Sequence, residues 1–142
     1  MKPFDYYLEI GEVKKAAPDL ALAKSLVRDM NSRIKDSKSL LTQNYPKIVF
    51  ENVYDALRDF ADAVLAIEGY KSYSHQASFA YLAKFNFNIQ MLETLDRFRY
   101  KRNGSKYYGQ TVSVEEAKEI LDFHNGIIKK IDRIIKEKGL SP

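Results

Sequence analysis

The chain has 142 residues, a net charge of +4 and 45% hydrophobic residues. These values suit one globular domain over residues 1–142 and argue against a disordered chain. The absence of cysteine excludes disulfides and thiolate metal sites, and two histidines are too few for a multi-histidine metal site, so we expect neither a metal nor a cofactor. No apolar run reaches the ~20 residues of a membrane span, and no signal peptide is visible, so we expect a cytoplasmic protein with no membrane partner.

The first segment, residues 1–17, is predicted to be an N-terminal extension of the domain. A short helical turn near residues 5–9 is expected to end at Gly11. Pro18 suits the first position of a helix, and apolar residues recur beyond it at spacings of three and four. This pattern predicts a long helix over residues 19–41.

The middle of the chain predicts a long helix followed by a shorter one. Pro46 opens the long helix, and Gly69 suits the position just past its C-terminus. Ser72 or Ser74 can cap the next helix, which is expected to run to about Lys84.

The last part of the chain predicts two more long helices. After a bend at residues 85–88, a helix is expected over residues 89–102. Ser113 and Glu116 form a capping box that opens the final helix, and residues 136–142 are expected to fray. Four long helices with short connections predict an all-α fold, an antiparallel up-and-down helical bundle of four long helices plus one shorter helix.

Basic and aromatic residues gather over residues 96–109, at the C-terminal end of the helix predicted over residues 89–102. This stretch holds five basic and four aromatic side chains. Basic groups neutralise phosphates, and aromatic faces stack on bases. Cations also favour the last turn of any helix, because they oppose its partial negative charge. The charge run alone therefore has a structural explanation as well as a functional one.

Helical geometry separates the arginines of this stretch. With Phe85, Leu92 and Leu95 taken as the apolar face, Arg99 falls near its centre and Arg102 falls on its flank. A charge on the core side must be paired or hydrogen bonded. Arg99 therefore either pairs with an acid on a neighbouring helix or faces a polar groove. The candidate acids are Asp55, Asp59 and Glu51.

Three segments of the chain resemble the HEPN family of small prokaryotic proteins. Residues 69–77 are similar to the joint before the third helix of these proteins, residues 99–109 are similar to their signature segment, and residues 11–26 are similar to archaeal members. The resemblance implies an all-α bundle that is usually a homodimer, and many members are metal-independent RNases. Members without the motif histidine bind nucleotides or RNA, or act as partners of nucleotidyltransferases.

The family motif is an arginine and a polar residue, with a histidine four to six positions on. The resemblance places this pair at Arg102, which would bind the scissile phosphate, and Asn103. The histidine is missing, and Tyr107 and Tyr108 stand at its spacing. A phenol, with a pKa of about 10, is a poor general base at neutral pH unless it is strongly activated.

Three functions therefore remain open. The first is a non-catalytic module that binds nucleotide or RNA phosphate. The second is a metal-independent RNase of the toxin–antitoxin type, with Arg102 and either Tyr107 or Tyr108 as catalytic residues. The third is an interaction partner of a separately encoded nucleotidyltransferase. The predicted binding residues are Arg99, Arg102, Asn103, Lys106, Tyr107 and Tyr108.

Both histidines and one glycine carry structural expectations. His75 is expected to cap or hydrogen bond near a helix start, toward the opposite end of the bundle from Arg102. His124 lies on the apolar stripe of the last helix and is expected to be a hydrogen-bonded core or interface residue. Gly126 stands mid-helix, where a helix crossing or a contact in a homodimer would explain it.

Overall fold

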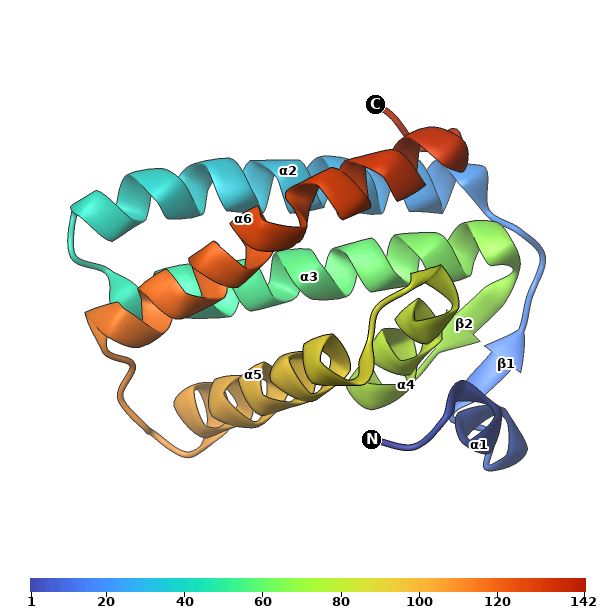
Figure 1. Ribbon diagram of the computed structural model, residues 1–142, viewed down its shortest axis with the longest axis horizontal. Coiled ribbons are helices and arrows are strands. Elements are labelled where there is room, and N and C mark those ends of the chain that lie inside the picture. The colour runs from blue at the N-terminus through green and yellow to red at the C-terminus, as the bar shows by residue number, and fades with distance from the viewer.

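The computed structural model describes all 142 residues, and most of them are helical (Figure 1). The all-α class predicted from the sequence is confirmed. No helix combines the length and apolar character needed to cross a membrane. The long helices are α2 (Leu20–Thr42), α3 (Pro46–Glu68), α5 (Ile89–Tyr107) and α6 (Val114–Glu137). The short ones are α1 (Phe4–Glu9), α4 (His75–Ala80) and a 3₁₀ helix (Tyr81–Phe85) that continues α4.

Helix α3 lies at the centre of the fold. It packs along α2, which precedes it across a short turn, and it also contacts α4, α5 and α6 (Figure 1). Pro46 occupies its first turn, and Gly69 ends it with a left-handed φ of 87°, as the sequence predicts. Large apolar side chains of α3, such as Phe50 and Phe60, are almost fully buried. Because α3 touches the other long helices, a polar side chain on it can reach several of them.

A two-stranded antiparallel ribbon joins the N-terminal extension to the segment before α4. Strand β1 (Val13–Lys15) pairs with β2 (Tyr70–Ser72), and Lys14 stands directly opposite Lys71. The sequence did not predict these strands, because three residues are too few to display an alternating pattern. Val13 is buried by the ribbon and packs with Tyr7 of the extension against α4. The extension is therefore part of the folded domain.

Side chains that cap helices mark several element boundaries where the sequence predicted them. Ser74 accepts a hydrogen bond from the backbone N–H of Ala77, at 3.3 Å, and opens α4. Ser113 and Glu116 form the predicted capping box at the start of α6. These interactions are local, so they satisfy helix-end N–H groups whatever the tertiary packing.

The C-terminal tail corrects a prediction, because residues 136–142 do not fray as a unit. Gly139 adopts a φ of 70°, and the N–H of Leu140 donates to the Ile135 carbonyl oxygen at 2.9 Å. This is a Schellman ending of α6. It turns Leu140 back into the core, where the side chain is completely buried.

Helix α5 differs from its prediction in both length and phase. Asn88 caps it, but the helix runs on through Asn103 to Tyr107 instead of stopping near Arg102. Phe85 belongs to the preceding 3₁₀ helix, and Asn86, with a φ of 64°, separates the two. Phe85 therefore does not share the helical phase of α5. The side chains of α5 that face the core are Leu95, Phe98, Arg102 and Ser105.

Candidate functional site

A polar pocket of about 210 Å³ lies between the start of α4 and the C-terminal half of α5. Four of the predicted binding residues line it, all from α5, and three further residues come from the start of α4. The lining residues are Ser74, His75, Gln76, Arg99, Arg102, Asn103 and Tyr107. Only Tyr107 among them is hydrophobic, so the pocket presents mostly charged and hydrogen-bonding groups.

Arg102 is the most deeply buried charged residue of the pocket. Its side chain is 8% exposed. Nη2 donates a hydrogen bond of 3.1 Å to Oδ1 of Asp55 on α3, and the guanidinium carbon lies 5.4 Å from the Tyr54 ring centroid and 5.9 Å from that of Tyr107. The Nε atom is buried and has no hydrogen-bond partner. The prediction that Arg102 sits on the flank of the helix and Arg99 at its centre is therefore wrong, because the buried face of α5 is marked by Leu95 and Phe98, and Leu92 is only partly buried.

The carboxylate that holds Arg102 is itself fixed by a second arginine. Arg33 of α2 lies 3.8 Å from Asp55 and donates through Nε to Asp59 at 3.0 Å. Asn52 completes the group by accepting from Arg33 at 3.0 Å. Burial raises the pKa of Asp59 to about 6, although Arg33 acts in the opposite direction. Because two arginines share Asp55, one carboxylate does not fully neutralise Arg102.

Arg99 is less buried than predicted, with 22% of its side chain exposed. Its Nε donates to Asp96, one turn earlier on the same helix, at 2.8 Å. The three candidate acids of α3 do not pair with it. Gln76 of α4 donates to the same Asp96 oxygen at 3.1 Å. Asp96 therefore joins α5 to the start of α4 and places Arg99 at the rim of the pocket.

His75 lies in the pocket beside Arg102, so the prediction that it stands at the opposite end of the bundle is wrong. The 3₁₀ helix and the turn at Asn86 connect α4 to α5, and residues 74–76 at the start of α4 line the same pocket as Arg99 and Arg102. Nδ1 of His75 is 2.7 Å from the Tyr54 hydroxyl, and the two rings are stacked. The sequence did not predict that His75 lies beside Arg102, because the residues around His75 carry no signal of its packing against α5.

Burial and neighbouring cations both disfavour the charged form of His75. Burial, followed by the positive charges of Arg58, Arg102, Arg99 and Lys106, lowers the pKa of His75 to about 4. The imidazole is therefore neutral at pH 7. Burial also raises the pKa of Tyr54, which keeps its hydroxyl protonated. The pocket thus carries a positive field from its arginines and holds a neutral, hydrogen-bonded histidine.

The remaining predicted residues lie at or beyond the mouth of the pocket. Tyr107 is 63% exposed, and the Lys106 ammonium stands 5.9 Å from its ring centroid. Lys106 is exposed and does not line the pocket. Tyr108 is also outside the lining and turns toward solvent. Of the two tyrosines at the motif spacing, only Tyr107 belongs to the pocket.

This arrangement can bind an anion. Arg102 lines the pocket and its Nε–H is buried without a partner, which costs about 1–3 kcal/mol relative to a satisfied N–H. Arg99 and the side chain of Asn103 add further donors at the rim. An anion with several acceptor oxygens matches these donors, and phosphate has this chemistry.

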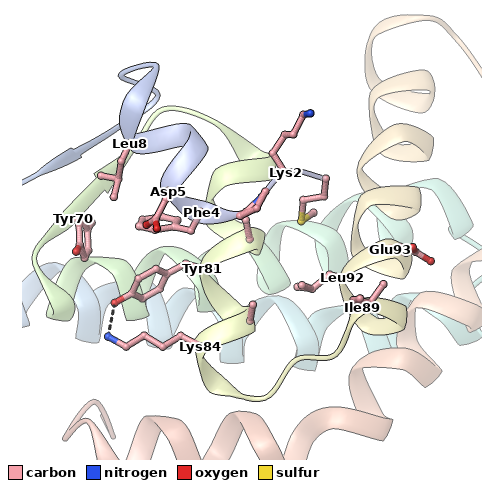
Figure 2. Close-up of a pocket in the computed structure, with 14 residues that line it drawn as sticks. Lys2, Phe4, Asp5, Leu8, Tyr70, Tyr81, Lys84, Ile89, Leu92 and Glu93 are labelled. Carbon is pink, nitrogen blue, oxygen red and sulfur yellow. Dashed lines mark hydrogen bonds between the residues drawn. The ribbon is translucent and has the colours of Figure 1, made fainter.

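A larger cavity of about 550 Å³ lies beside α1, and it has a different character (Figure 2). Phe4, Tyr70 and Tyr81 pack against one another along its wall. Its inner polar groups are already partnered: Tyr81 donates to Glu68 at 3.1 Å, and Lys84 donates to the Tyr81 hydroxyl at 3.4 Å. The wall of the larger cavity is therefore mostly apolar, and the charged side chains that line it besides Lys84 are Lys2, Asp5 and Glu93.

The other two structural expectations lie on α6. His124 is buried, as predicted, but neither ring nitrogen has a hydrogen-bond partner. No atom lies within 4 Å of the position that a Cβ would take at Gly126, so a helix crossing within this chain does not explain the glycine. The homodimer contact stays a prediction.

No group of three or more histidine, aspartate or glutamate side chains is placed to hold a metal ion. Comparisons with known proteins find no match: no family model, no curated protein and no solved structure is similar to this chain. The HEPN resemblance therefore depends on the motif residues alone, and the function has to be argued from the pocket.

Proposed function

We propose that the chain is a HEPN-like module that binds the phosphate of RNA or of a nucleotide in the pocket between α4 and α5. In this proposal the four long helices form the antiparallel up-and-down bundle of that family. The observation that carries the proposal is Arg102, a buried arginine with an unpartnered Nε at the base of a polar pocket. The role matches the one that the resemblance gives to this arginine.

The groups around Arg102 support binding of a nucleotide over binding of a simple anion. Arg99 at the rim and Lys106 at the mouth extend the positive charge outward from the phosphate position. Tyr107 exposes a ring within reach of a base, and stacking of a base on an aromatic ring contributes about 1–3 kcal/mol. We therefore expect the phosphate to lie at Arg102 and the base to lie toward Tyr107.

Binding of labelled single-stranded RNA in EDTA, measured over a range of salt concentrations, tests this proposal. Arg102→Ala should weaken binding about 10-fold or more, because hydrogen bonds to charged groups contribute about 1.5–3 kcal/mol. It should also make the salt dependence shallower. Arg97→Ala is the matched control, because Arg97 lies on the same helix but is exposed and pairs with Glu119 at 2.8 Å.

AMP competition assigns the contact to phosphate, and adenosine is the neutral comparison. AMP should displace the RNA and adenosine should not. Equal loss of affinity in Arg102→Ala and Arg97→Ala would contradict the pocket and leave only general electrostatic attraction. No RNA or AMP binding by the wild-type protein would remove the proposal.

RNA cleavage is the second candidate function, and the position of His75 favours it. The predicted catalytic pair of Arg102 with Tyr107 or Tyr108 lacks a group that titrates near neutrality. His75 supplies an imidazole in the same pocket, at a place that the motif spacing does not indicate. In this reaction Nδ1–H of His75 donates to the Tyr54 oxygen, which leaves Nε2 free to accept the proton of the ribose 2′-hydroxyl as the 2′-oxygen attacks phosphorus. The 5′-oxygen leaves and takes a proton from water, which gives a 2′,3′-cyclic phosphate and a 5′-hydroxyl.

The low pKa of His75 makes it a weak base in the unliganded protein. A bound phosphate offsets the charges of Arg99 and Arg102 and therefore strengthens this base. Cleavage should then persist in EDTA, stop in His75→Gln, and leave a cyclic phosphate end. Binding without cleavage would leave a non-catalytic module, which is the main proposal.

We also propose that the protein forms a homodimer. Gly126 lies on the surface of α6 with open space in front of it, as a close contact between two copies requires. Light scattering at micromolar concentration should give twice the monomer mass, and a monomer would contradict the dimer without affecting the pocket. The nucleotidyltransferase partner stays a prediction that pull-down from the native cell would test.

A further inference from the structure

The outer face of the β1–β2 ribbon gathers two lysines around one exposed tyrosine. Lys14 and Lys71 stand directly opposite each other in the antiparallel register. Their ammonium groups lie 5.9 Å and 5.5 Å from the ring centroid of Tyr73, which follows β2 and is 60% exposed. We call these three residues the ribbon platform.

Cation–π contacts of the two ammonium groups with the Tyr73 ring explain only part of this arrangement. Like charges that face each other across two strands destabilise the pair. No ion pair of the structure includes Lys14 or Lys71, so no carboxylate offsets this repulsion. Tyr73 leaves most of its ring in water, although the buried face of the ribbon was available to apolar residues such as Val13. An anionic partner with a flat apolar part would offset the repulsion between the two lysines and cover the exposed ring of Tyr73.

The ribbon platform adjoins the pocket through the chain itself. Tyr73 is followed directly by Ser74 and His75, which both line the pocket. Two residues of extended chain span at most about 7 Å, so the backbone of Tyr73 starts close to the pocket wall. Tyr73 is also fixed in place, because its backbone N–H donates to the Glu12 carbonyl oxygen at 2.8 Å.

We propose that the ribbon platform is a second binding surface for single-stranded RNA whose phosphate occupies the Arg102 pocket. The inference rests on the proposed function. A neighbouring base stacks on Tyr73, and Lys14 and Lys71 contact the phosphates on either side of that base. Single-stranded RNA fits better than a duplex, because only an unpaired base offers its face to an isolated ring.

The proposal predicts that short and long ligands depend on different residues. AMP reaches the Arg102 pocket alone, whereas an RNA of about eight nucleotides reaches both surfaces. Tyr73→Ala should weaken binding of the oligonucleotide about 5- to 150-fold, as expected for a lost stacking contact. Binding of AMP by this variant should stay within twofold of wild type, because Tyr73 does not line the pocket.

The lysines are tested by their contribution to the salt dependence. Lys14→Gln with Lys71→Gln removes two phosphate contacts, so the slope of log affinity against log salt for the oligonucleotide should fall by about 1.4. Lys129→Gln with Lys136→Gln is the matched control, since both residues are exposed lysines on α6 and make the same change in net charge. Tyr73→Phe is the conservative variant and should bind the oligonucleotide like wild type.

Three outcomes separate this inference from the proposed function. Selective loss of oligonucleotide binding in Tyr73→Ala and in the Lys14/Lys71 variant, with AMP binding intact, supports the ribbon platform. Wild-type oligonucleotide affinity in both variants, while Arg102→Ala weakens both ligands, overturns the ribbon platform and leaves the pocket standing. Failure of the wild-type protein to bind either ligand overturns both proposals.

Discussion

Arg102 and His124 are both buried polar side chains with nitrogen atoms that have no partner, yet their surroundings differ. Arg102 opens into a polar pocket and lies among further cations. His124 faces the core side of α6 and lines none of the five main cavities. An unpartnered buried nitrogen is therefore not evidence for a site by itself. It becomes evidence when a ligand has room to reach it.

Closing the pocket should leave Arg102, like His124, without room for a ligand. The resulting loss of AMP affinity is the largest effect that we expect. Asn103→Phe places a ring in the mouth of the pocket and should weaken AMP binding about 10- to 100-fold, because the ligand loses its charge-assisted hydrogen bonds. Ala83→Phe makes a comparable change at the larger cavity near α1 and should leave AMP binding within twofold of wild type. Equal effects of the two variants would contradict the assignment of the site to the polar pocket.

The two histidines should respond differently to a phosphate ligand. Burial lowers the pKa of both, and the cations of the pocket lower that of His75 further, to about 4. Saturating phosphate offsets those cations, so the pKa of His75 should rise by about one unit, while that of His124 should not move. NMR titration of the two imidazoles, with and without phosphate, measures both values in one sample. A rise at both histidines, or at neither, would contradict the comparison.

The sign of the pH effect on stability follows from the same values. Both histidines bind a proton less readily in the folded chain than in the unfolded chain, where the pKa is about 6.5. Their contribution to the free energy of unfolding is therefore complete above that pH and is lost as the pH falls below it, for His75 down to about 4. The raised pKa of Asp59 acts in the opposite direction over the same range, so the histidines are tested by a difference: urea unfolding at pH 7 and pH 5 should show a smaller loss, or a larger gain, of stability at pH 5 for His75→Gln with His124→Leu than for wild type.

His124→Leu should raise the free energy of unfolding by about 1 kcal/mol at pH 7, the smallest effect in this series. A leucine fills much of the same space and leaves no buried nitrogen without a partner. The variant should also lose part of the acid sensitivity, and its AMP affinity should equal that of wild type. Reduced AMP binding would mean that His124 acts on the site after all.

Local chemistry made much of the fold predictable from the sequence. Proline at the start of α3, glycine at its end and the capping box of α6 act within a few residues, so their structural meaning can be read in the chain itself. The ribbon of Val13–Lys15 and Tyr70–Ser72 escaped this reasoning, because each strand is too short for a periodic signal. Leu140 escaped it too, since the residue reaches the core only by the reversal at Gly139.

The candidate site was predictable in composition but not in arrangement. The basic and aromatic content of α5 pointed to this helix end, and four of its residues line the pocket. The positions of Arg99 and Arg102 were exchanged because Leu92, which is only partly buried, was taken as a core residue of α5, whereas Phe98 is the buried one. His75 could not be placed, since its contact with the site depends on how α5 packs against α4. Errors of this kind come from tertiary packing, which no local pattern contains.

Arg102→Met tests the central claim most directly, with AMP affinity and the free energy of unfolding measured in the same preparation. Methionine can fill the buried space without a charge or an unpartnered donor, and Asp55, which is 28% exposed, keeps Arg33 at 3.8 Å, so no carboxylate is left buried and unpaired. We predict at least about a 10-fold loss of AMP affinity, with stability unchanged or increased, because functional groups are often retained at the expense of stability. A variant that is clearly less stable but binds AMP like wild type would contradict the account, and would make Arg102 a structural partner of Asp55.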